Sequence, residues 1–123
     1  MSEFIDLYDQ NRKLLNREVD RTTYLFQPGE FMMYVLAILE NSQGEFLVTQ
    51  RAFNKKWAAG NWEMPGGGAK SKESSLDAIK REVKEETGLD VKMVGLSILI
   101  LMRIMIDMII ILWIFIILSL ILI

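Results

Sequence analysis

The chain contains no cysteine and no histidine, and each absence excludes a class of chemistry. Without cysteine there is no disulfide framework and no thiolate metal site, and the composition is compatible with a reducing cytoplasm. Without histidine there is no Ser-His-Asp triad and no histidine-bound zinc site, and the side chain that most often acts as a general base is missing. Any general base in this protein must therefore be a different side chain, such as a carboxylate.

A basic surface and a secretion signal are missing as well. The net charge is −2, which gives no electrostatic footprint for nucleic acid. The first six residues, Met-Ser-Glu-Phe-Ile-Asp, lack the basic and apolar regions of a secretion signal. A length of 123 residues suits one domain of ordinary size. We therefore expect a cytoplasmic protein that does not bind nucleic acid.

Small residues are missing from one part of the chain only. Residues 96–123 contain no Gly, Ala, Val, Thr or Pro and consist almost entirely of Ile, Leu, Met and Phe. Residues 1–95 have the composition of a soluble globular protein. We therefore divide the chain into a domain over residues 1–95 and an apolar tail over residues 96–123.

The tail supports three interpretations. Residues 104–123 are long enough for a membrane helix, with Asp107 as the one charged residue, and Lys92 and Arg103 before them would keep the domain cytoplasmic. Membrane helices normally use small residues for packing, however, and this tail has almost none. Ala, Gly and Pro have GC-rich codons, and their absence from the tail favours a frameshift product of an AT-rich gene. The third interpretation is a buried C-terminal element of the domain.

Residues 1–95 are predicted to form mainly strands and turns. Strands are predicted over residues 4–8, 16–20, 31–39, 45–51 and 90–94, with a turn over residues 41–44. Arg51 and the loop that follows it, Asn54-Lys55-Lys56-Trp57, could meet phosphates or a nucleobase. The alternative is a solvated basic loop whose Trp57 covers the core.

Residues 62–68, Trp-Glu-Met-Pro-Gly-Gly-Gly, form a short strand that breaks into a loop. Three glycines in a row let the backbone pass close to a ligand or a neighbouring strand. This loop, which contains Gly66 and Gly67, leads directly into a helical segment.

The segment after this loop predicts an amphipathic helix between a Ser71 N-cap and a C-terminal Gly88. On a helical wheel Glu82, Glu85 and Glu86 share an arc of about 100° beside an apolar stripe. Like charges at this spacing destabilise a helix slightly, so the cluster points to a bound cation. Oxygen ligands from one helix suit Mg²⁺ or Mn²⁺.

The same segment carries a family resemblance. Residues 67–89 match the 23-residue signature of the Nudix hydrolases at every fixed position, which are Gly67, Glu73, Arg81, Glu82, Val83, Glu85, Glu86, Gly88 and Leu89. The preceding Trp-Glu-x-Pro-Gly-Gly is similar to the entry that many Nudix domains show. Residues 6–11 resemble the branch that includes isopentenyl-diphosphate isomerase, but that chemistry needs a catalytic cysteine, which this chain lacks.

The resemblance implies an α/β fold, a Nudix α/β/α sandwich with a mixed sheet, incomplete at its C-terminus. It implies metal-dependent hydrolysis of a diphosphate linkage in a small nucleoside diphosphate derivative. Glu82, Glu85 and Glu86 would hold Mg²⁺ or Mn²⁺, with Glu82 as the proposed base and Arg81 orienting Glu85. Arg51, Gly66 and Gly67 would bind the substrate. If a further acidic residue beyond the signature acts as a metal ligand or general base, the tail offers only Asp107. The competing hypothesis is a catalytically weak or inactive Nudix remnant.

Overall fold

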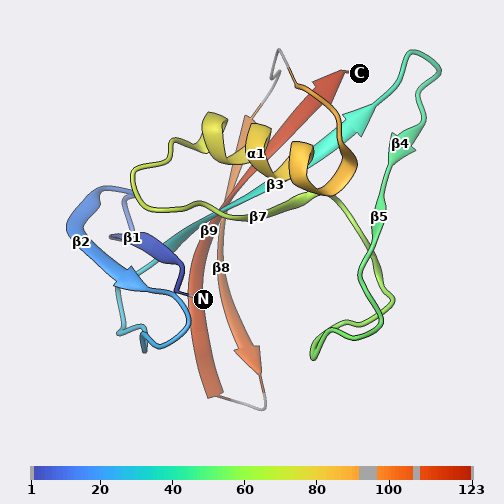
Figure 1. Ribbon diagram of the computed structural model, residues 1–123. Coiled ribbons are helices and arrows are strands. Elements are labelled where there is room, and N and C mark those ends of the chain that lie inside the picture. Colours follow the sequence, from blue (N-terminus) through green and yellow to red (C-terminus); the bar gives the residue numbers. More distant parts are fainter. Residues whose placement is uncertain (1, 92–96, 107–108, 123) are drawn as a thin grey trace.

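The computed structural model describes residues 2–91, 97–106 and 109–122, and within them the chain forms one α-helix and nine strands (Figure 1). The helix is α1 (Ser75–Thr87). The strands are β1 (Phe4–Tyr8), β2 (Leu14–Asp20), β3 (Met32–Glu40), β4 (Phe46–Leu47), β5 (Thr49–Gln50), β6 (Trp62–Glu63), β7 (Gly66–Gly68), β8 (Ser97–Ile106) and β9 (Ile109–Leu122).

The main sheet is mixed and centres on β3. On one side β3 pairs with β9 in parallel, from Met32↔Ile114 to Glu40↔Leu122, and β9 pairs with β8 antiparallel. On its other side β3 pairs antiparallel with β7 and, further along, with β4. The α/β fold with a mixed sheet is therefore confirmed, and the loop from β7 leads straight from the sheet into α1.

The two faces of β3 pack against different parts of the molecule. Val35, Ala37 and Leu39 are fully buried in one cluster with Ile79 and Val83 of α1. Burying a side chain of this size contributes about 1.5–3 kcal/mol, which fixes the helix on this face of the sheet. Because side chains alternate along a strand, the intervening residues of β3 face the opposite side.

On that opposite face Met32 packs with Ile5 of β1, and the partly buried Val19 and Phe26 complete the cluster. The β1–β2 hairpin is antiparallel, and Tyr8 forms a bridge with Phe31. The strand predicted over residues 4–8 is thus confirmed, and the one predicted over residues 16–20 begins two residues earlier, at Leu14. The hairpin approaches β7 from the side opposite to α1.

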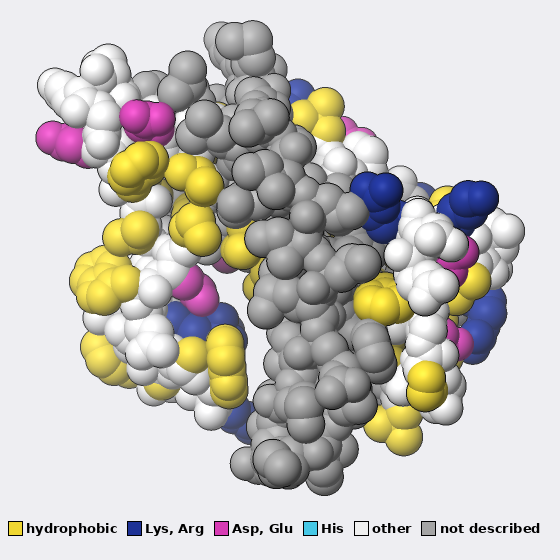
Figure 2. Space-filling model, turned by 180° about the vertical axis from the view of Figure 1, so that it is seen from behind, with side chains coloured by type: hydrophobic (Ala, Val, Ile, Leu, Met, Phe, Trp, Pro, Cys, Tyr) yellow, Lys and Arg dark blue, Asp and Glu magenta, His cyan; other side chains and the backbone are white. Residues whose placement is uncertain are grey.

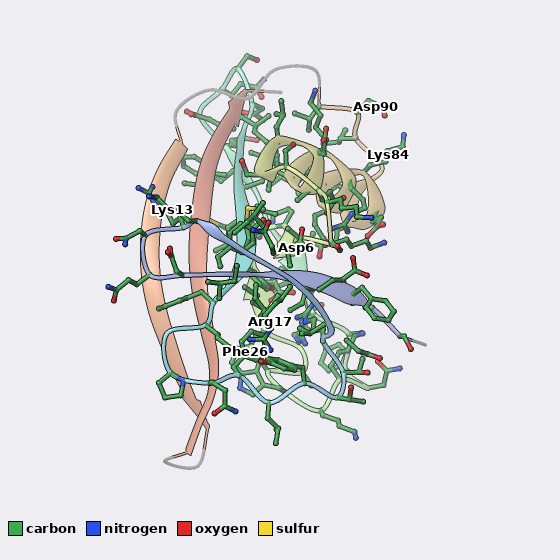
Figure 3. All side chains as sticks on the ribbon, turned by 90° about the vertical axis from the view of Figure 1, so that its left-hand side faces the viewer. Asp6, Lys13, Arg17, Phe26, Lys84 and Asp90 are labelled. Carbon is green, nitrogen blue, oxygen red and sulfur yellow. The ribbon has the colours of Figure 1, made fainter. Side chains whose placement is uncertain are left out.

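A polar network closes the loop between β2 and β3. The carboxylate of Glu30, which is 8% exposed, accepts bonds from Arg17 Nη1 at 2.6 Å, Tyr24 Oη at 2.7 Å and the Gln27 N–H at 3.0 Å. Burial raises the pKa of Glu30, but these three bonds outweigh it and leave the pKa below its usual value. The Tyr24 ring lies near Arg17, whose guanidinium is 5.8 Å from its centroid, and Phe26, whose ring centroid is 5.5 Å away; Arg17 and Phe26 are labelled in Figure 3.

The segment after the 41–44 turn differs from the continuous return strand predicted over residues 45–51. It is divided into β4 and β5, and β5 pairs with β6 in a separate two-stranded ribbon. The β5–β6 arm leaves the sheet, and the apolar side chains of β4 and of this arm are exposed, as the yellow patches at the left of Figure 2 show. The exposed residues are Phe46, Val48, Phe53, Trp57, Trp62 and Met64.

The tail forms β8 and β9 and not the membrane helix that was one of its three interpretations. Among the described residues no helix is long and apolar enough to cross a membrane. Ile121 lies in the same buried cluster as Ile79 and Val83 of α1, as expected of a buried element of the domain, and the frameshift interpretation stays a prediction. Asp107 and most of the strand predicted over residues 90–94 lie outside the described residues.

Candidate active site

Helix α1 begins later than the sequence indicated. Its N-cap is Ser74, whose Oγ accepts from the Asp77 N–H at 3.1 Å, and its C-terminal Gly88 has φ 78° as predicted. Ser71, the predicted N-cap, instead donates its hydroxyl to Glu18 and lies within hydrogen-bond distance of Asp6. The predicted cap was wrong because Ser71 and Ser74 both precede the apolar stripe, and spacing alone did not distinguish them.

Arg81 connects the acidic residues of the helix. Its Nη1 donates to Glu82 Oε1 at 2.7 Å and to Glu85 Oε2 at 3.3 Å. The predicted salt bridge to Glu85 is therefore confirmed, and the bond to Glu82 is the shorter of the two. Both carboxylates are held on one side of α1 by a cation that belongs to the helix itself.

Glu73 also belongs to this network, although a helical wheel extended back to residue 73 would place it on the side opposite Glu82, Glu85 and Glu86. It accepts a fork of two bonds from Arg81, at 2.6 Å to Nε and 2.9 Å to Nη2, and a third from the Lys70 N–H at 2.8 Å. Burial raises the pKa of Glu73, but the bonds from Arg81 and Lys70 leave it lowered. Glu73 lies before the helix begins, so the wheel did not apply to it.

The glycines of β7 let the strand pass close to the helix. A Cβ on Gly67 would lie 2.4 Å from Glu82 Oε1, so only glycine leaves room for that carboxylate. The Gly66 N–H donates to Glu86 Oε2 at 3.2 Å, and the Gly68 carbonyl accepts from Arg81 Nη2 at 3.1 Å. Gly67 therefore faces Glu82 of α1, while Gly66 and Gly68 reach Glu86 and Arg81 through their backbone groups.

Glu86 carries the largest perturbation of any carboxylate for which a shift is resolved. Although much of its residue surface is exposed, crowding of its carboxyl group by protein atoms raises the pKa to about 7, and the negative charges of Glu82, Glu63 and Glu85 add to this. The Gly66 N–H acts in the opposite direction. Such repulsion among carboxylates is what a bound cation would relieve.

A cleft of about 530 Å³ opens beside these residues. Its walls come from the N-terminus and β1, the end of β2, β7 and α1. The lining residues are Ser2, Glu3, Phe4, Arg21, Gly67, Gly68, Lys70, Arg81, Glu82 and Glu85. Sequence reasoning identified Gly67, Arg81, Glu82 and Glu85 of this set, and it missed Arg21 and Lys70 because neither belongs to a motif.

Arg51, predicted to bind substrate, does not line this cleft. Its Nε donates to the Trp57 carbonyl at 2.8 Å, its guanidinium lies 5.7 Å from the centroid of the Trp57 ring, and Nη1 lies 3.6 Å from Glu63. Trp57 is 62% exposed, so the expectation that it covers the core was wrong. Arg51 stabilises the β5–β6 arm, and its role in substrate binding stays a prediction.

The donor chemistry of the helix suits a hard divalent cation. Glu82, Glu85 and Glu86 offer only carboxylate oxygens, and these repel one another when no cation is present. Within the described residues no group of three acidic side chains is already placed to hold a metal ion. Arg81 engages Glu82 and Glu85, and the Gly66 N–H engages Glu86. Binding an ion there therefore requires these side chains to rotate toward each other.

Comparison with known proteins decides the family. The NUDIX domain model matches residues 30–99, more than half of the chain, and this range contains β3, β7 and α1. The chain belongs to the Nudix family. Its signature segment, residues 67–89, contains Arg81, the three clustered glutamates and Gly67 of β7.

Relatives in sequence are Nudix proteins of bacteria and animals. An uncharacterized Nudix hydrolase of Listeria innocua is 33% identical over 87 residues, which cover 70% of this chain and 51% of that protein. The chain thus spans about half the length of this relative. The 8-oxo-dGDP phosphatase NUDT18 of Danio rerio is 43% identical over 54 residues, 44% of this chain and 16% of that protein.

Solved structures show the same fold. The MutT protein from Methanosarcina mazei Go1 superposes with a TM-score of 0.61 at 29% identity, over 73% of this chain and 62% of that one. DR0079 from Deinococcus radiodurans superposes with a TM-score of 0.70 at 20% identity, over 98% of this chain and 72% of that one. The second match shows a likeness of fold that extends over almost the whole chain.

Proposed function

We propose that this Nudix domain is a metal-dependent hydrolase that cleaves the diphosphate linkage of a nucleoside diphosphate derivative. The observation that carries the proposal is the pairing of opposite charges across one cleft. Glu82 and Glu85 form an acidic wall on α1, while Arg21 and Lys70 line the same cleft. A substrate that suits both walls is an anion bound together with a cation, which describes a metal-complexed diphosphate.

The chain divides the work among a few side chains. Glu82, Glu85 and Glu86 would hold Mg²⁺ or Mn²⁺, which lowers the pKa of a bound water and neutralises phosphate oxygens. Arg81 positions Glu82 and Glu85 by the bonds described above, and Glu73 holds Arg81 in turn. Gly67 of β7 leaves space for the carboxylate of Glu82. Glu82 is the carboxylate that we assign as proton acceptor, since no histidine is present.

The relatives support the substrate class. One of them is named as an 8-oxo-dGDP phosphatase, and a structural neighbour is a MutT protein. This chain covers 16% of the first protein and 62% of the second. We therefore propose, for this chain, an activity of the same class.

The test is release of phosphate or nucleotide from a panel of nucleoside diphosphate derivatives, with Mg²⁺, with Mn²⁺ and with a chelator. We expect turnover that requires the metal and that disappears in Glu85→Gln. Glu45→Gln is the matched control, because Glu45 lies in the exposed turn after β3 and makes the same change of charge away from the cleft. Equal turnover of Glu85→Gln and the wild type, or no metal-dependent turnover of any substrate, would refute the proposal.

A further inference from the structure

The cleft has a second wall that no motif describes, and its chemistry points to a phosphate. Arg21 comes at the end of β2, where its N–H donates to the Glu3 carbonyl at 2.8 Å. Its guanidinium lies over the backbone of β7, because a Cβ on Gly68 would sit 2.8 Å from Nη1. Gly68 thus leaves room for Arg21 in the way that Gly67 leaves room for Glu82.

The alternation of β7 explains how one short strand serves two walls. Successive side-chain positions along a strand point to opposite faces. Gly67 faces Glu82 on the helix side, and Gly68 faces Arg21 and Met32 on the hairpin side. The backbone of β7 therefore lies between the carboxylates that would hold the metal and the guanidinium of Arg21, with the cleft open to both.

Arg21 differs from the other cleft arginine in how its donors are used. Arg81 is committed to Glu73, Glu82, Glu85 and the Gly68 carbonyl. Across the part of the chain that the structure describes, the Arg21 guanidinium makes no hydrogen bond, and its ion pair with Glu3 is long, at 3.7 Å, and one-third exposed. An exposed pair of this kind contributes little, so a stronger acceptor can displace Glu3.

We propose that Arg21, together with Lys70 of the same cleft, binds the phosphate of the substrate that lies away from the metal. This inference rests on the proposed function. A guanidinium offers parallel N–H donors whose spacing matches two phosphate oxygens, and such charge-assisted bonds are about twice as strong as neutral ones. Arg21 then fixes the diphosphate across β7, so that its linkage faces the carboxylates of α1.

Inorganic pyrophosphate is the probe that separates this inference from the proposed function, because its binding can be measured by calorimetry with or without turnover. In Mg²⁺ buffer we expect Arg21→Gln to weaken pyrophosphate binding by about 10- to 100-fold, the range for losing hydrogen bonds to a charged group. Arg21→Lys keeps the charge without the fork and should give an intermediate loss. Lys13→Gln is the matched control, since Lys13 lies at the end of the hairpin away from α1 (Figure 3) and lines no part of the cleft.

Glu3→Gln supplies a test in the opposite direction. This variant removes the carboxylate that competes for Arg21, so pyrophosphate should bind more tightly than to the wild type. If turnover is measurable, Arg21→Gln should raise KM by the same factor and leave kcat within a few-fold, because Arg21 touches the phosphate that does not react. A thermal melt of each variant confirms that the fold is intact.

The outcomes divide as follows. Wild-type affinity for pyrophosphate in Arg21→Gln, weaker binding in Glu3→Gln, or equal losses in Lys13→Gln and Arg21→Gln would overturn the inference. A wild-type chain that binds no pyrophosphate would overturn it too. A chain that binds pyrophosphate through Arg21 but hydrolyses nothing would retain the subsite and refute the proposed function alone.

Discussion

Replacing Gly67 with alanine tests whether the close approach of β7 to α1 serves the site or only the fold. The new Cβ would lie 2.4 Å from Oε1 and 2.5 Å from Cδ of Glu82, and contacts below 3.0 Å are essentially never observed. The obstacle is the end of a flexible side chain, so the carboxylate can retreat while the backbone stays in place. We therefore expect Gly67→Ala to fold and to lose the position of Glu82.

The size of the effect follows from two distances. The carboxylate must move by at least about 0.6 Å, away from a position where it bonds to Arg81 Nη1 at 2.7 Å. Misplacing a catalytic group by about 1 Å can lower a rate by about 100-fold. We expect kcat/KM for a nucleoside diphosphate substrate to fall by about 10- to 100-fold. Stability should change by no more than about 1 kcal/mol, since alanine is better tolerated than glycine inside a strand.

Two readouts check this expectation. Steady-state kinetics with Mg²⁺ measure kcat/KM, and Mn²⁺ titration followed by electron paramagnetic resonance measures metal affinity without turnover. Gly66→Ala is the contrasting variant, because its Cβ would lie 2.1 Å from the Val35 carbonyl oxygen, which is backbone and cannot rotate away. That variant should be destabilised by about 1–3 kcal/mol or more.

A second-site change makes the test more specific. Glu82→Asp shortens the side chain by one methylene and restores the space that alanine at position 67 occupies. In a double-mutant cycle the two substitutions should therefore be non-additive, with Gly67→Ala costing little in the Glu82→Asp background. Wild-type kinetics and Mn²⁺ affinity in Gly67→Ala would refute the reasoning, and so would strict additivity of the two changes.

Three further predictions concern stability, each measured by urea unfolding. Glu73→Gln should lower the free energy of unfolding by about 1–3 kcal/mol, because Arg81 loses its forked partner, while Mn²⁺ affinity falls much less than in Glu85→Gln. Ser74→Ala removes the N-cap of α1 and should lower it by about 1 kcal/mol, whereas Ser74→Asp should not. Folding lowers the pKa of Glu30, so the charged carboxylate stabilises the folded state. This stabilisation is fully present above the unfolded pKa, near 4.5, and is lost as the pH falls through the folded pKa. Wild-type stability should therefore decrease more steeply below about pH 4.5 than that of Glu30→Gln; parallel pH profiles would contradict this.

Local pattern was sufficient for the helix and for its acidic arc. Glu82, Glu85 and Glu86 gather on one side of α1 because the spacing of residues on a helix is fixed by its 3.6-residue turn, whatever packs around it. The turn after β3 and the glycine at the helix end were predicted for the same reason, since each depends on a few adjacent residues. The signature over residues 67–89 added the family, which the comparisons confirmed.

Contacts between distant segments could not be predicted from spacing. Glu73 reaches Arg81 only because the chain bends before Ser74, and a helical wheel extended past the cap assigns it to the wrong side. The tail forms β8 and β9 because β3 offers a free edge to pair with, more than 70 residues earlier in the chain. Hydrophobic composition alone fits a membrane helix and a buried strand equally well.

The sequence by itself thus determined that this protein presents three carboxylates on a helix that follows a glycine-rich strand, because both features are local and the signature is specific. Only the tertiary structure decided what faces those carboxylates. Arg21 is more than 40 residues before Glu82 in the chain, and its place in the cleft depends on how the β1–β2 hairpin packs beneath β7. That packing is set by the burial of Ile5 against Met32. No sequence motif marks such a contact between two apolar side chains.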